Sequence, residues 1–253
     1  MYKFRYLDAH YAVEMKVGHS DGSEHCVCMS FAVVAKYQNE EQRYMISINR
    51  EKVKLKDSTD DENPAHDVMI ELGNALYPVM MYVLADGTIV GVANFEDICK
   101  RREAVCQDIL RKAYSISTAT YIELSKSNFA DEKAFIETFC NQIFIQLLFV
   151  NPDSDHFEVQ LMNLKHAGST DIMHFKKKIS EVGNFAFTAS GDAFGESVLE
   201  YAISDFGDVL SLNGAFIKSF DEKDVATVNI EITSDMNRRV VKKENKLLSF
   251  FID

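Results

Sequence analysis

The densest group of metal-binding side chains in the sequence lies between residues 19 and 28. His19, His25, Cys26 and Cys28 offer the imidazole nitrogens and thiol sulfurs that zinc prefers, and a loop leading into a strand can bring such groups together. Their spacing matches none of the recurrent zinc signatures, and on a strand Cys26 and Cys28 share one face, where thiols simply pack. We therefore favour a polar hairpin loop and keep these four residues as the candidate ligands of the alternative, a metal site.

Three other segments suggest chemistry, and each lacks a required feature. The acidic runs at 57–62 and 153–158 contain carboxylates but not the pattern of an EF-hand calcium loop. The segment 191–195 has glycines at both ends without the Lys-Ser/Thr ending of a phosphate loop. Cys140 lies in an apolar segment, which favours an inert core thiol over a nucleophile. We assign no catalytic residue and no cofactor, and we predict that the protein is not an enzyme.

The charge of the chain is acidic, with 39 acidic and 27 basic residues and a formal net charge of −12. A field of this sign repels nucleic-acid phosphates and speeds encounter with basic proteins, although acidity also serves plain solubility. The one strongly basic cluster, at 238–243, would spread its charges over both faces of a strand. We interpret it as a charged edge strand, and we predict a protein partner, basic in character, and no nucleic acid.

The sequence also indicates the cellular compartment of the protein. Charges at Lys3, Arg5, Asp8 and Glu14 interrupt the apolar run that a secretory signal requires. No stretch reaches the ~18 consecutive apolar residues that span a bilayer. Five cysteines spread over 253 residues fit reduced thiols better than a disulfide framework. These features predict a cytoplasmic protein without membrane insertion, and they give no indication of oligomeric state.

The hydrophobic pattern divides the chain into a strand-rich start, a helix-rich middle and a strand-rich end. Alternating aromatic and β-branched residues predict strands through residues 1–56, with turns at 18–24 and 38–42. Two apolar runs joined by Asp86–Gly87 predict a hairpin with a two-residue type I′ turn. Capping residues and helical spacing then predict helices over 64–76, 95–112 and 131–149, and a segment rich in Thr, Ile and Tyr predicts a strand over 115–124.

Strand patterning returns beyond residue 155. The predicted strands lie at 157–161, 185–189, 198–203, 209–216, 225–232, 240–241 and 247–252, with a short helix over 171–180. This order predicts an α+β protein in which the three middle helices pack on a large, curved antiparallel sheet. We expect a single α+β domain over 1–253. The alternative is two α+β domains, 1–150 and 151–253, that meet at a polar joint.

Two functions from different classes fit these features. The first is a non-enzymatic acidic binding protein, such as an immunity-type inhibitor that covers a basic toxin, with residues 192–224 contributing acidic surface. The alternative is a carrier that holds an apolar small molecule between the curved sheet and the helix at 131–149. The order of elements resembles that of carriers in which a half-open barrel wraps over a helix. Ten methionines suit an adaptable lining for such a cavity.

Overall fold

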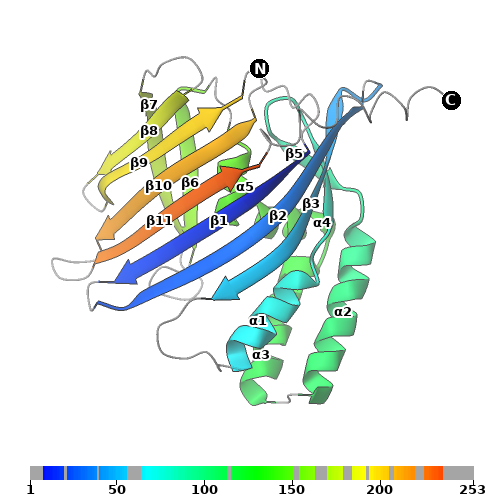
Figure 1. Cartoon of the computed structure of the whole chain (residues 1–253). Coiled ribbons are helices and arrows are strands. Elements are labelled where there is room, and N and C mark those ends of the chain that lie inside the picture. The colour runs from blue at the N-terminus through cyan, green and yellow to red at the C-terminus, as the bar shows by residue number, and fades with distance from the viewer. Residues whose placement is uncertain are drawn as a thin grey trace.

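A large antiparallel sheet dominates the structure, a computed structural model (Figure 1). The structure describes residues 8–19, 22–38, 40–55, 64–112, 115–150, 154–162, 170–178, 184–191, 194–204, 208–219 and 225–235. The described residues form one sheet of 11 strands in the order β5-β4-β3-β2-β1-β11-β10-β9-β8-β7-β6. Since β5 and β6 lie at its two edges, the sheet is open.

The first and last strand blocks join in this one sheet. Strand β1 pairs antiparallel with both β2 and β11, so it lies at the centre although it comes first in the chain. The strands of the first block are β1 (Asp8–His19), β2 (Glu24–Gln38), β3 (Arg43–Leu55), β4 (Val79–Val83) and β5 (Ile89–Val92). Those of the last block are β6 (His156–Met162), β7 (Thr170–Lys178), β8 (Asn184–Gly191), β9 (Phe194–Ile203), β10 (Val209–Ser219) and β11 (Val225–Ser234).

The sheet curls strongly at the end that carries β6 to β10. Phe175 on β7 and Phe216 on β10 have ring centroids only 5.9 Å apart. Two strands separate β7 from β10, so in a flat sheet these positions would lie about 14 Å apart. Phe157 on β6 likewise contacts Phe187 on β8 at 5.8 Å. The rings therefore meet on the concave side of a curved, open sheet.

The helices pack on the hollow side of the sheet or extend beyond it. In Figure 1, α4 and α5 lie behind the sheet, whereas α1, α2 and α3 form a lobe beside it. The predicted fold class, an α+β protein with helices on a large curved antiparallel sheet, is confirmed. The helical segments are α1 (Pro64–Asn74), α2 (Phe95–Lys112), α3 (Ile116–Leu124), the 3₁₀ helix η1 (Ser125–Phe129), α4 (Glu132–Cys140) and α5 (Ile143–Leu148).

Strand alternation gives the sheet two faces of different character. We call the face that packs against α5 the inner face, because Tyr11 of β1 and Phe31 of β2 contact Phe144 of α5 there. Side chains on the inner face form the main core, and nearly all are apolar. The opposite, outer face carries the intervening residues, which include Glu14 and Lys16 on β1. This division places polar chemistry on the outer face and apolar packing on the inner one.

Two predicted elements have the wrong secondary structure. Residues 115–124 were expected to form a strand but form α3, because the Ser115 side chain caps the helix by accepting a hydrogen bond from the Thr118 N–H (3.0 Å). Ile122 of α3 then packs in a second cluster with residues of α1 and α2. Residues 171–180, expected to be helical, lie mostly in β7, where the alternation of buried Met173 and Phe175 with exposed neighbours has the period of a strand.

Two further predictions need smaller corrections. The helix expected over 131–149 is two helices, because the backbone of Gln142 is extended (φ −68°, ψ 125°) and separates α4 from α5. The hairpin between β4 and β5 forms, but its predicted type I′ turn is wrong. Only Gly87 has positive φ (92°), whereas type I′ requires positive φ at both central residues. Leu84 and Thr88 instead close a three-residue loop, with Leu84 N donating to Thr88 O (2.9 Å).

Several predictions lie outside the described residues. These are the acidic run at 57–62, the basic cluster at 238–243 and the strands at 240–241 and 247–252, together with parts of the acidic surface expected over 192–224. Among the described helices, none combines the length and apolar character that a membrane span requires.

Candidate functional site

The outer face carries a row of polar residues that crosses the centre of the sheet. Its members are aligned by strand pairing, because Cys28 of β2 pairs with Glu14, Glu14 with Glu231 of β11, Glu231 with Asn213 of β10, and Asn213 with Glu200 of β9. Side chains at directly paired positions lie about 5 Å apart. Residues far apart in the chain therefore form one continuous polar row.

Two carboxylates in this row face each other directly. Glu14 and Glu231 are cross-strand partners, a placement that destabilises a sheet because like charges repel. Lys16, two residues along β1 on the same face, offsets part of this repulsion. Its Nζ lies 2.8 Å from Glu14 Oε1, and this contact with the carboxylate raises the pKa of Lys16. Unfavourable local placement of this kind is expected at functional sites more than elsewhere.

A groove of about 460 Å³ runs along the row on the outer face. Three glutamates and one lysine line it, so its charge is negative. The side chains of Asn213 and Asn229 add amide donors and acceptors, and Val198 and Ala215 contribute apolar surface. This mixture suits a cationic or strongly hydrogen-bonding ligand.

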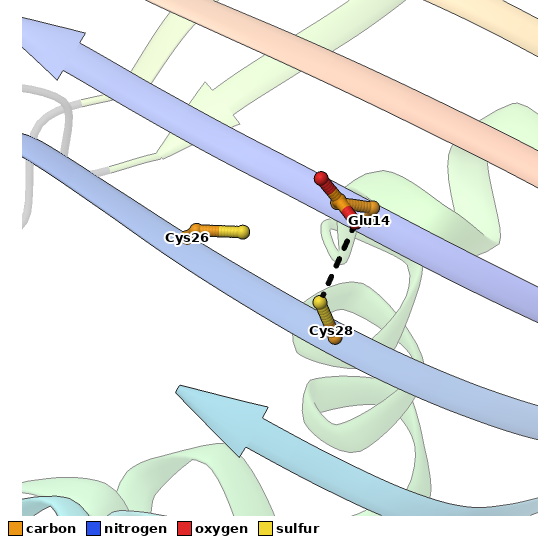
Figure 2. A group of neighbouring side chains, drawn as sticks. All are labelled: Glu14, Cys26 and Cys28. Atoms are coloured by element: carbon orange, nitrogen blue, oxygen red, sulfur yellow. Dashed lines mark hydrogen bonds between the residues drawn. The ribbon is translucent and has the colours of Figure 1, made fainter. Parts of the chain in front are cut away.

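A cluster of possible metal ligands lies where the row reaches β2. Figure 2 shows Glu14 on β1 beside Cys26 and Cys28 on β2. The potential ligand atoms of these three residues lie within 4.8 Å of one another. The Cys28 thiol donates a hydrogen bond to Glu14 Oε2 at 3.7 Å, drawn as the dashed line. Cys26 is buried at 6% exposure, whereas Cys28 and Glu14 are half-buried.

The predicted metal ligands are only partly brought together. Cys26 and Cys28 share the outer face of β2, as their spacing predicted. His25 lies on an exposed part of the same strand, but alternation directs it to the other face. The side chain of His19 lies outside what the structure describes.

Sequence reasoning missed Glu14, although a signal for it was present. The predicted turn at 18–24 is centred on residue 21, and the observed β1–β2 pairs all have residue numbers that add to 42. A hairpin with that centre places Glu14 opposite Cys28. Hairpin register, and not residue spacing along the chain, would have located the cluster.

The remaining described cysteines are in less reactive surroundings. Burial raises the pKa of Cys140 to about 11, and it also raises the pKa values of Cys99 and Cys106. Thiols of this kind are weak nucleophiles at neutral pH. The raised pKa favours the prediction that Cys140 is inert, although its side chain is half-buried and not fully within the core.

Comparison with known proteins identifies no family for this chain. No family model matches the sequence, and no curated protein matches it. Among solved structures, a LolA superfamily protein from Nitrosomonas europaea aligns over 96% of this chain and 94% of its own, at 8% identity and a TM-score of 0.19. A TM-score this low is no evidence of a shared fold or function.

Proposed function

We propose that the protein is a carrier that binds an apolar small molecule inside its curled sheet. The observation that carries this proposal is the aromatic character of the inside of the curl. Phe175 meets Phe216 edge-on, and Phe187 meets Tyr201 in the same manner at 6.2 Å. These rings are at most 2% exposed, so they would become the apolar lining that such ligands prefer once a ligand displaces the side chains that cover them.

Helix α5 occupies the position that a ligand would take. It has six residues, and its Phe144 ring stacks on Phe31 with centroids 4.2 Å apart and meets Tyr11 at 6.0 Å. Phe144 is itself only 2% exposed, so it fills the space between the helix and the sheet. An apolar ligand of similar shape would replace this ring, and α5 would move outwards when the ligand enters.

Side-chain hydrogen bonds link α5 to strands β6 and β9. The Gln146 side chain donates from Nε2 to Gln160 O (2.9 Å) and accepts at Oε1 from Gln160 N (2.8 Å). Gln160 lies on β6, an edge strand, so the Gln146 amide satisfies backbone groups that would otherwise lack a strand neighbour. The Tyr201 hydroxyl donates to Leu147 O at 3.3 Å. A ligand that enters by displacing α5 would have to break these hydrogen bonds.

The first test is a search for the ligand itself. Protein purified under native conditions is denatured and extracted with organic solvent, and the extract is analysed by mass spectrometry. We expect an apolar molecule in stoichiometric amount. The proposal is abandoned if the extract contains none and the delipidated protein also shows no saturable uptake of a fluorescent fatty acid.

The second test concerns the role of α5. The change Gln146→Ala removes the two hydrogen bonds that join α5 to β6, worth about 1–3 kcal/mol together, so uptake of the fluorescent fatty acid should become about 5- to 150-fold faster. Glu137→Gln on the exposed side of α4 is the matched control and should leave the rate unchanged. Equal uptake rates for Gln146→Ala and the wild type would show that α5 does not limit entry.

The acidic groove favours a second candidate, the binding of a basic protein partner. Glu14, Glu200 and Glu231 would meet its cationic side chains, and this attraction would make association fast and salt-sensitive.

Affinity capture with the wild type, and with the double change Glu200→Lys and Glu231→Lys, tests this second function. A basic partner retained by the wild type at low salt and lost with the variant supports this function. Capture that is indifferent to both salt and charge reversal excludes it. Inhibition of a toxin is a narrower hypothesis, which depends on the captured partner being a toxin.

A further inference from the structure

We propose that Glu14, Cys26 and Cys28 bind one thiophilic divalent cation of the zinc class between β1 and β2. The site is separate from the inside of the curl, because the three side chains lie on the outer face. The proposed metal site does not depend on either of the functions proposed above. Two thiol sulfurs and a carboxylate oxygen are a ligand set that zinc and cadmium accept and that magnesium and calcium do not favour.

The distances fit a shared ion. Zinc binds sulfur at about 2.3 Å and carboxylate oxygen at about 2.1 Å, so two such ligands at the tetrahedral angle lie about 3.6 Å apart. The observed distance from Cys28 Sγ to Glu14 Oε2 is 3.7 Å. The Cys26 sulfur lies within 4.8 Å of the Cys28 sulfur and of a carboxylate oxygen of Glu14, so a rotation of side chains can bring it into the same shell. Little rearrangement is therefore needed.

The backbone disfavours the competing reaction, a disulfide between the two cysteines. Neither Cys26 nor Cys28 forms a disulfide in the structure. Residues two apart on an extended strand have Cα atoms about 6.6 Å apart, near the upper limit for a disulfide. Pairing with β1 on one side and β3 on the other keeps β2 extended at Cys28. The two sulfurs consequently remain available as metal ligands.

Lys16 acts as a positioning residue for the carboxylate. Its ammonium group contacts Oε1 of Glu14, whereas Oε2 is the oxygen that faces Cys28. The carboxylate can keep the lysine on one oxygen and bind the ion through the other, as metal-binding carboxylates commonly do with neighbouring donors. Binding breaks one S–H bond in each cysteine, forms two metal–sulfur bonds and releases two protons to the solvent.

Three protein ligands leave one position of a tetrahedral ion open. Glu14 and Lys16 also line the acidic groove, so the ion would lie at its end. Water or a groove-bound molecule would fill the fourth position. The neighbouring Glu231 adds negative charge, which favours the binding of a dication at this site.

The test is a titration of the reduced, metal-free full-length protein with cadmium, followed through the ultraviolet charge-transfer band of cadmium thiolates. We expect one equivalent to bind, zinc to displace it, and two protons to be released for each ion. Cys28→Ser and the nearly isosteric Glu14→Gln should each weaken binding about 10- to 100-fold, whereas Cys99→Ser on α2 should bind as the wild type does.

Two further results complete the test. Lys16→Met leaves all three ligands in place, so it should change cadmium binding less than Glu14→Gln does. Circular dichroism of each variant establishes that it is folded. The proposal is overturned if the folded wild type gives no thiolate band at one equivalent, or if folded Cys28→Ser and Glu14→Gln retain wild-type affinity.

Discussion

At the scale of single residues, Asp208 is the described carboxylate whose ionised form is most disfavoured by its surroundings. It is 3% exposed, and its Oδ1 has no hydrogen-bond partner among the described residues. Burial raises the pKa of Asp208 to about 6, although the Ser204 hydroxyl, which donates to Oδ2 at 3.2 Å, opposes the shift. The native state therefore holds a proton that the unfolded chain has already lost at the same pH.

This difference predicts how stability depends on pH. As the pH rises from about 4 to about 6, the unfolded state binds fewer protons at this residue than the native state does, so the contribution of Asp208 to stability falls. Above pH 6 the folded protein bears the full free-energy cost of the buried, ionised Asp208 carboxylate, which is at most about 3 kcal/mol. Asp208→Asn should remove it, so the variant gains stability over the wild type mainly between pH 4 and 6 and keeps that gain at pH 7.

Urea unfolding of both proteins at several pH values measures the effect. Asp97→Asn, at an exposed position on α2, is the control and should show no such pH-dependent gain. A constant stability difference between Asp208→Asn and the wild type from pH 4 to 7 would contradict the assigned ionisation.

At the scale of elements, strand β10 shows how tightly the inner face is packed. Gly214 lies between Leu199 of β9 and Ile230 of β11, and both are its pairing partners. A Cβ atom built on Gly214 would lie 2.8 Å from a methyl carbon of each neighbour. Since real Cβ atoms do not approach carbon so closely, any larger residue forces the buried side chains of Leu199 and Ile230 to shift.

Gly214→Ala should therefore destabilise the protein by about 1–3 kcal/mol, even though alanine is ordinarily no worse than glycine in a strand. Chemical denaturation measures the change in the free energy of unfolding. Asn213→Ala, one residue earlier on the exposed outer face, should cost no more than about 0.5 kcal/mol. If the two variants are equally stable, the inner face has more free space than the structure indicates.

At the scale of the whole molecule, the pairing of β1 with β11 couples the two ends of the chain. The two strands share nine paired positions, from Tyr11 with Ser234 to His19 with Ala226. The Tyr11 hydroxyl also donates to Val209 O of β10, at 3.2 Å. A division at residue 150 would break this junction and expose an unpaired edge on both fragments.

We therefore predict that the chain unfolds as one cooperative unit. Urea transitions followed by circular dichroism and by tyrosine fluorescence should coincide, and the fragments 1–150 and 151–253 should not fold separately. Two separate transitions, or a folded fragment with a cooperative melt of its own, would favour the alternative of two α+β domains.

Much of this architecture follows from local sequence. The alternation of apolar residues determined most strands, helical spacing determined α2 to the residue, and the order of elements determined the fold class. The pair Cys26 and Cys28 was correctly placed on one strand face for the same reason, since alternation of side chains is a property of the extended backbone itself. These signals act over a few residues and need no knowledge of distant contacts.

Tertiary structure decided what depends on segments far apart in the chain. Strand register brought Glu14 to Cys28 and Glu231 to Glu14, and the curl of the sheet brought Phe175 to Phe216. The β-branched residues of α3 had predicted a strand, but the segment is helical and its Ile122 packs against α1 and α2. Pairing and curvature are set by the summed packing of the whole sheet, so a residue's own neighbours in sequence carry little information about them.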